Sequence, residues 1–123
     1  MLSLPLPGKW LSEMKFGGEF NELEKIQLLQ RSILVNSFAY YELNENILSD
    51  FQYDDNGKQL AEMKKQYPEE FKQSRYYPYF HDYCADGTHY TSGFDLLERV
   101  RKTDDKLYRY IWMDALMALD RKK

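Results

Sequence analysis

Three tyrosines and two aspartates near the middle of the chain are the residues best suited to a specific chemical task. They are Tyr40, Tyr41, Asp50, Tyr53 and Asp54. The first two end one helical pattern, a polar hinge follows, and the other three open a second helical pattern, so we expect all five at one corner. Aromatic faces with nearby negative charge suit a flat cationic ring, and carboxylates accept hydrogen bonds from hydroxyl and amide groups. The sequence therefore indicates a binding corner.

The same residues also have an ordinary structural interpretation. The three tyrosines are equally suited to the core between two helices. Asp50 is suited to capping the second helix, and such a cap typically contributes about 0.5–2 kcal/mol. Asp54 has less structural reason for its position, so it distinguishes the two interpretations best.

The first helix that positions the corner is predicted from about Glu22 to Leu43. Asn21 and Glu24 form a capping box at its start. Apolar residues then recur at three- and four-residue spacing along two adjoining stripes, which contain Ile26, Leu29, Ile33, Leu34, Phe38 and the two adjacent tyrosines. Because this apolar face is wide, we expect at least two partners to cover the helix.

The second helix is predicted to begin at the capping box Ser49-x-x-Gln52 and to end near Gln66, before Pro68. Between the two helices lies the hinge 44–46, whose asparagines tolerate the left-handed conformation of a helix end. Asn56-Gly57 is an irregularity in this helix, since glycine costs about 1 kcal/mol relative to alanine.

The rest of the chain is predicted to hold a short helix near 69–74, an aromatic loop and two helices. The aromatic loop contains Tyr76, Tyr77, Tyr79, Phe80, Tyr83 and Tyr90. The two helices extend from Ser92 to about Lys102 and, after a cap at Thr103 or Asp104, to about Arg121. The last one is apolar all round and is predicted to be central. We therefore expect an all-α single domain over 1–123, with a helical hairpin at 22–71 covered by the loop and helices of 72–123.

Composition excludes several classes of protein. The chain has 123 residues and a formal net charge of −3, so we expect no general attraction for nucleic-acid phosphates. The single cysteine, Cys84, leaves no internal disulfide and suits a reducing cytoplasm. No apolar run approaches the roughly 20 residues of a membrane span, and the start of the chain lacks signal-peptide features. We expect a soluble cytoplasmic protein, with residues 1–18 as an irregular arm that packs onto the body.

Three motifs carry a resemblance to a known family. They are Tyr40-Tyr41-Glu42-Leu43-Asn44, then Ser49-Asp50-Phe51-Gln52-Tyr53-Asp54, then Gln66-Tyr67-Pro68-Glu69. In this order they resemble the small N-terminal helical domain, called Ia, of NAD-dependent DNA ligases. Small free-standing phage and prophage proteins related to that domain look similar, and their D-G-S-T-G-[FY]-D-L ending is echoed by residues 86–88 and 92–96. If the chain is phage-encoded, its location would be the host cytoplasm.

The resemblance implies roles for the corner. In the ligases this domain closes over the nicotinamide mononucleotide half of NAD, so Tyr40 and Tyr53 would flank the nicotinamide ring. Tyr41, Asp50 and Asp54 would contact the ribose, carboxamide or phosphate region.

The chain also departs from the ligase pattern. Asn36 stands where the family often has histidine, and Cys84 stands in place of the nucleophilic lysine of K-x-D-G. We therefore expect a non-catalytic module, not a ligase, that recognises NAD or nicotinamide mononucleotide. A separate adenylation domain is one candidate partner.

Other interpretations of the sequence remain open. The runner-up is a small interaction or inhibitor protein that binds another protein through the aromatic surface of 76–90, since aromatic residues are favoured at interface hot spots. His81, Cys84 and His89 could ligate zinc, but their spacing matches no standard site, and we expect no metal. Cys84 with a histidine could also form a thiol nucleophile, but the sequence offers no third group to orient the histidine, so this interpretation ranks lower still. Basic residues near the C-terminal helices, at 99, 101, 102, 106 and 121–123, are predicted to form a solvated face.

Overall fold

The computed structural model describes residues 21–85 and 89–122. The expectations for residues 1–18 and 86–88 lie outside this part of the chain. Within it, the regular elements are α2 (Glu22–Leu43), α3 (Asp50–Gln66), α4 (Pro68–Gln73), α5 (Tyr77–Phe80), α6 (Gly93–Thr103) and α7 (Asp105–Lys122). The β-type pairing there is a single isolated bridge between Ala85 and Tyr90. The predicted all-α fold is confirmed.

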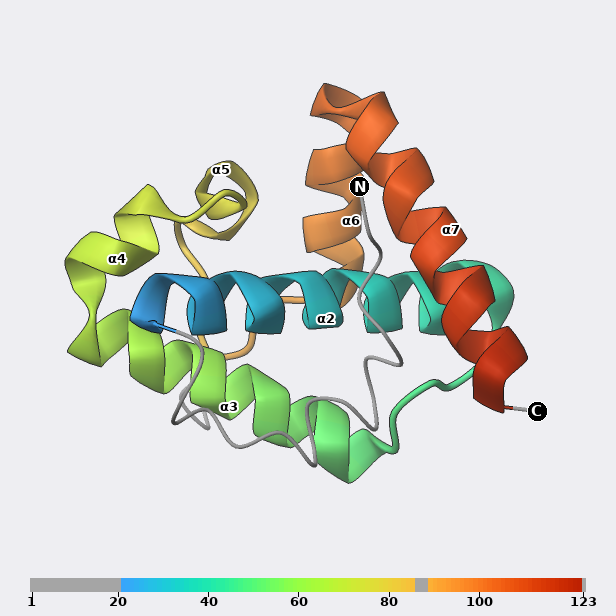
Figure 1. Ribbon diagram of the computed structural model, residues 1–123, viewed down its shortest axis with the longest axis horizontal. Coiled ribbons are helices and arrows are strands. Elements are labelled where there is room, and N and C mark those ends of the chain that lie inside the picture. Colours follow the sequence, from blue (N-terminus) through green and yellow to red (C-terminus); the bar gives the residue numbers. More distant parts are fainter. Residues whose placement is uncertain (1–20, 86–88, 123) are drawn as a thin grey trace.

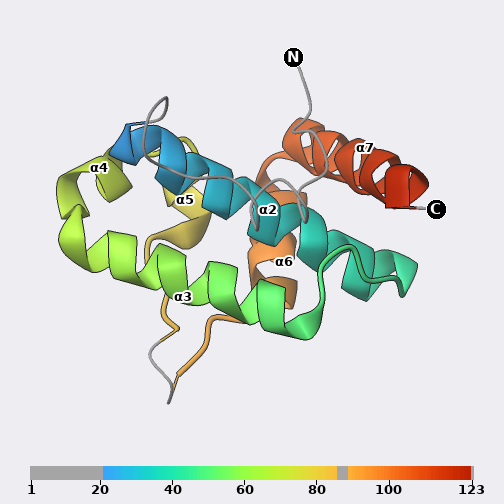
Figure 2. The same ribbon diagram turned by 60° about the horizontal axis from the view of Figure 1, so that its bottom comes forward.

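Helix α2 is the centre of the molecule. It contacts α3, α4, α6 and α7, and every residue from Leu29 to Ala39 is buried. Figure 1 shows α2 running through the middle, with α3 antiparallel to it and α7 crossing its C-terminal half. In the view of Figure 2, α7 and α3 lie on opposite sides of α2, and α6 lies on the same side as α3. The expectation of at least two covering partners is confirmed.

The start signals of the helices act as predicted. Asn21 and Ser49 each accept a backbone N–H in a complete capping box, and Asp104 accepts the N–H of Leu107 at the start of α7. Pro68 does more than end α3, because it opens α4 at a position where proline loses no helical hydrogen bond. The aromatic loop contains one helix that the sequence pattern did not predict, the single turn α5.

Gly57 does not interrupt α3, and its lack of a side chain leaves room for Tyr83 of the aromatic loop. The hydroxyl of Tyr83 donates a hydrogen bond to the Gly57 carbonyl at 3.3 Å. A Cβ at position 57 would lie 2.8 Å from that hydroxyl. Its neighbour Asn56 is buried and donates to Ser32 of α2. The Asn56-Gly57 step therefore allows α3 to approach both α2 and the loop closely.

The prediction that the last helix is central is wrong. α7 buries one face, with Ile111, Ala115 and Ala118, while Trp112, Met113 and Leu116 are exposed. α2 takes the central place although it carries polar side chains, because Gln30, Arg31, Asn36 and Ser37 form hydrogen bonds inside the bundle, with only the Gln30 Oε1 atom left without a partner among the described residues. An apolar pattern cannot reveal these bonds. No helix in 21–85 or 89–122 has the length and apolar character needed to cross a membrane.

A buried ion pair fixes α7 on α2. The Arg31 guanidinium donates to the Asp114 carboxylate through Nε at 3.0 Å and also through a terminal nitrogen. Its other terminal nitrogen donates to the Tyr76 hydroxyl at 3.1 Å. Arg31 and Asp114 are 4% and 3% exposed, so each charge is shielded from water and is stabilised by its partner instead.

Replacing Asp114 with alanine should destabilise the fold by about 3–5 kcal/mol, because the Arg31 charge would stay buried without its partner. Urea denaturation measures the loss. Asp105→Ala is the control, since it breaks an exposed pair with Arg109 on the same helix and should cost at most about 0.5 kcal/mol. If Asp114→Ala costs no more than the control, the pair is not a structural anchor.

Candidate functional site

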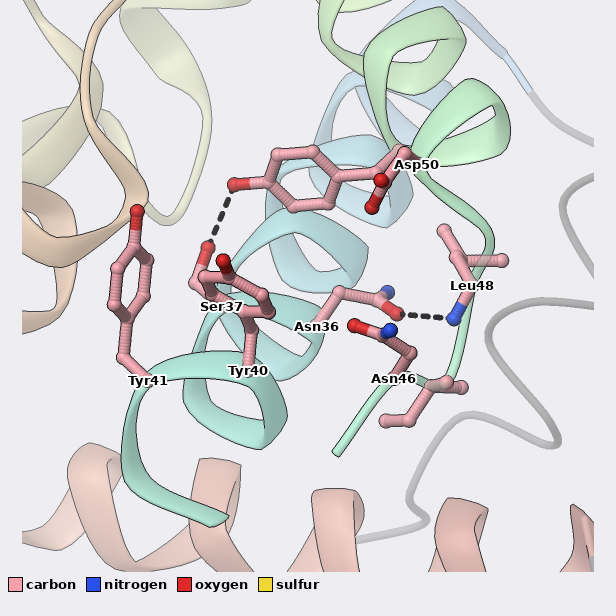
Figure 3. A pocket seen from close by; sticks show the side chains of 9 residues that line it. Asn36, Ser37, Tyr40, Tyr41, Asn46, Leu48 and Asp50 are labelled. Atoms are coloured by element: carbon pink, nitrogen blue, oxygen red, sulfur yellow. Dashed lines mark hydrogen bonds between the residues drawn. The ribbon is translucent and has the colours of Figure 1, made fainter. Parts of the chain in front are cut away.

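A small pocket lies where α2 ends and α3 begins. Its volume is about 110 Å³, and it is lined by Asn36, Ser37, Tyr40, Tyr41, Asn46, Ile47, Leu48, Asp50 and Tyr53. Four of the five residues expected at the corner thus surround one pocket. Figure 3 shows Tyr40 and Tyr41 projecting from the last turns of α2, with Asp50 across from them at the start of α3.

The two adjacent tyrosines form the open wall of the pocket. Tyr40 is 54% exposed and Tyr41 is 44% exposed, so neither is the ordinary core residue of the structural interpretation. Their rings meet edge to face, with centroids 4.9 Å apart. Tyr41 also makes an edge contact with Phe94 of α6, at 5.7 Å between centroids. These contacts pack the ring edges together while leaving about half of each side chain exposed.

Tyr53 lines the pocket but is more enclosed than Tyr40 and Tyr41. Its ring packs against the hydrophobic core, and a 2.8 Å hydrogen bond joins its hydroxyl to that of Ser37. A Cβ at position 93 would lie 2.2 Å from the Ser37 Oγ and 2.7 Å from the Tyr53 hydroxyl, so Gly93 lets α6 approach this pair. Tyr53 therefore supports the pocket more than it offers a free aromatic face.

Asn36 holds the hinge that closes the pocket. Its Oδ1 accepts the backbone N–H of Leu48 at 3.1 Å, as Figure 3 shows. Its Nδ2 donates to the carbonyl of Ser32 at 2.7 Å. Asn44 turns the chain with a φ of 54°, which asparagine tolerates better than most residues. At the position where the ligase family often has histidine, Asn36 thus connects the hinge to α2 through these hydrogen bonds.

Asp54 is not part of this pocket. It lines a neighbouring pocket of about 200 Å³ together with Gly57, Tyr83, Ala85, Tyr90, Thr91, Ser92 and Gly93. Tyr41 and Tyr53 line both pockets and form their shared wall. Asp54, one helical turn beyond Asp50, therefore lines the neighbouring pocket with Tyr41 and Tyr53 instead of the pocket that Asp50 lines.

Sequence reasoning missed part of the pocket lining. Asn46, Ile47 and Leu48 were expected only as hinge residues, and Asn36 only as a departure from the ligase pattern. The available signal was an asparagine inside an otherwise apolar helical run. Such a residue is buried only when its amide is satisfied, as Asn36 is here.

The aromatic loop is not the exposed surface that the runner-up interpretation needed. Tyr76, Phe80 and Tyr83 are buried, and Tyr77 and Tyr79 pack against the core. Tyr90 alone among the six is largely exposed, at 57%. The loop thus completes the core beside α2 and α3 and leaves Tyr90 as its most exposed aromatic side chain, while binding of another protein stays a prediction.

The candidate metal ligands do not form a cluster. Within 21–85 and 89–122, no group of three or more histidine, cysteine or acidic side chains could hold a metal ion. The His81 ring lies against Tyr77, and Cys84 is a free, partly buried thiol.

Two of the basic residues near the C-terminus are held by carboxylates. Arg99 donates to Asp82 at 2.7 Å and to the Tyr79 carbonyl at 2.8 Å. Arg101 pairs with Glu98 one turn earlier on α6. The Arg99 hydrogen bond holds the pKa of the Asp82 carboxyl below its ordinary value. These pairs support the interpretation of this region as a solvated face.

Comparison of the chain with models of known protein families, with curated proteins and with solved structures finds no match. The resemblance to ligase domain Ia therefore stays a prediction from the three motifs. The pocket has to be interpreted from its own geometry.

Stability should fall as the pH rises above about 10. Burial raises the pKa of the Tyr53 and Tyr83 hydroxyls above the ordinary value of 10.0. A raised pKa in the folded state means that the unfolded chain loses these protons first. The stability linked to the neutral hydroxyls is therefore present below pH 10 and is lost as the pH rises through the folded-state values.

Urea denaturation at a series of alkaline pH values tests this. Tyr53→Phe should give a shallower decline in the free energy of unfolding than the unmodified protein. Tyr110→Phe, which alters an exposed ring, serves as the control and should leave the decline unchanged. Equal slopes for Tyr53→Phe and the unmodified protein would contradict the assignment.

Proposed function

We propose that this protein is a non-catalytic binding module whose pocket at the α2–α3 hinge takes a flat cationic ring. The nicotinamide ring of nicotinamide mononucleotide, free or within NAD, is the ligand that the motifs suggest. The observation that carries the proposal is the exposure of two adjacent tyrosine rings opposite a carboxylate. Aromatic faces attract cations, and the attraction grows where water is partly excluded.

The size and charge of the pocket support a ring more than a whole dinucleotide. A volume of about 110 Å³ suits one aromatic ring, so the ribose and phosphate would lie outside it. Asp50 is exposed at the rim, where its carboxylate suits a positive ring nitrogen, a carboxamide NH2 or a ribose hydroxyl. Asn46 adds an exposed amide on the hinge side.

The ligand-recognition set in this proposal differs from the one that the resemblance implies. Tyr40, Tyr41 and Asp50 contact the ligand, Tyr53 supports the pocket from below, and Asp54 is left outside. An adenylation domain supplied by a separate protein remains the candidate partner, because a module of this kind would present the nicotinamide half of NAD to it.

Isothermal titration with nicotinamide mononucleotide, and separately with NAD, tests the proposal. Saturable binding is expected. Tyr40→Ala should weaken it by roughly tenfold, as expected when a cation–π contact worth about 1–2 kcal/mol is lost. Asp50→Asn should also weaken it, because the negative charge is lost while the side-chain shape stays. No saturation at millimolar ligand would refute the proposal.

Two variants serve as controls. Phe51→Ala removes an aromatic ring that is 80% exposed and adjacent to Asp50 but does not line the pocket, so affinity should be unchanged. Asp54→Asn should also leave affinity unchanged. If Asp54→Asn abolishes binding while Asp50→Asn does not, the ligand lies in the neighbouring pocket instead.

A further inference from the structure

The outer face of α7 presents large apolar side chains to solvent. Trp112, Met113 and Leu116 are 47%, 55% and 49% exposed, and Tyr110 is also exposed on the flank of this face. We refer to these four side chains as the α7 face. The opposite side of the helix is held in the bundle by the Arg31–Asp114 pair and by buried alanines. Contiguous exposed apolar surface of this kind marks interaction sites.

Charged residues lie at both ends of the α7 face, with Lys106 and the exposed Asp105–Arg109 pair before it and Asp120 after it. Lys106 lies seven residues before Met113, and Asp120 lies seven residues after it. Seven residues are close to two helical turns, so both charges lie on the same stripe as Met113. Both side chains are exposed. Among the residues that the structure describes, neither forms an ion pair.

This arrangement of charges is complementary to a second copy of itself. If two α7 helices pack antiparallel about a two-fold axis beside Met113, Asp120 of each copy lies next to Lys106 of the other. A parallel arrangement would instead bring like charges together at both ends. Antiparallel packing also places the positive end of each helix dipole beside the negative end of the other, which is favourable.

We propose that this protein forms a symmetric dimer through the α7 face, with the two-fold axis at Met113. In such an interface the same patch serves both copies. Methionine at the centre suits it, because its flexible, polarisable side chain adapts to a facing copy. One helix face is smaller than the roughly 800 Å² per partner of a typical stable interface, so the dimer is expected to dissociate on dilution.

The dimer interface is separate from the candidate binding pocket, because no residue of α7 lines that pocket. Light scattering coupled to size-exclusion chromatography, or sedimentation equilibrium, measures the association without any ligand. The unmodified full chain should approach twice the monomer mass as its concentration rises. A monomer at every concentration would overturn the dimer and assign the α7 face to another occupant.

Charge reversal tests the proposed register. Asp120→Lys alone, or Lys106→Glu alone, should weaken dimerisation roughly tenfold or more, because two symmetric ion pairs become two repulsions. The double variant with both changes should restore the dimer, since the pairs are re-formed with reversed signs. Glu62→Lys on α3 is the matched control, because it makes the same kind of charge change away from α7. Failure of the double variant to recover would refute the register.

A cysteine at the predicted axis gives a second, geometric readout. In a Cys84→Ser background, Met113→Cys should form an intermolecular disulfide under mild oxidation, since position 113 faces itself across the axis. Glu62→Cys in the same background should not. Equal cross-linking of the two variants would show random collision and contradict the proposed interface.

Discussion

The buried ion pair between Arg31 and Asp114 joins the two helices that run through opposite ends of the sequence, α2 and α7. Taking two charges out of water is costly, and the cost is offset only when the geometry satisfies both groups. Arg31 meets this condition by donating to Asp114 and to the Tyr76 hydroxyl. One side chain of α2 thereby fixes α7 on one side and the segment before α5 on the other.

Further polar residues of α2 extend the same principle along the helix. Gln30 donates to Ser74 after α4, Asn36 accepts from the hinge, and Ser37 bonds to Tyr53 of α3. Each contact joins α2 to a different neighbour, so the bundle is positioned by directional bonds as well as by apolar packing. These side chains disfavour other arrangements of the helices, since each misplaced partner would leave a further buried polar group unsatisfied.

The sequence predicted the helices well because their boundaries are local features. Capping boxes at Asn21 and Ser49 act within four residues, and the cap at Asp104 does the same. The relative placement of helices could not be predicted so well, because it depends on contacts between distant residues. Arg31 and Asp114 are 83 positions apart, and nothing in either local pattern indicates that a charge is buried. Because apolar residues surround α7 in the sequence pattern, α7 was predicted to be the central helix. In the structure α2 occupies that place.

The candidate site shows the same division between local and distant information. The motif Tyr40-Tyr41 and the start of α3 were predicted to meet, and the hinge does bring Tyr40, Tyr41 and Asp50 around one pocket. Whether Tyr53 faces a ligand or a helix depends on Gly93, which comes from a segment forty residues later and leaves room for the Ser37–Tyr53 hydrogen bond. That dependence could not be read from the spacing of the motif.

The overhang of α2 explains why a pocket forms at this place. Continuous burial of α2 ends at Ala39, whereas the helix continues to Leu43, so the adjacent tyrosines project beyond the packed bundle. The edge contacts from Tyr40 to Tyr41 and from Tyr41 to Phe94 restrict these rings before any ligand arrives. Restricting the rings in advance lowers the conformational entropy lost on binding. For the proposed function, this means that the aromatic pair has edge contacts that position its rings while about half of each side chain stays open to a ligand.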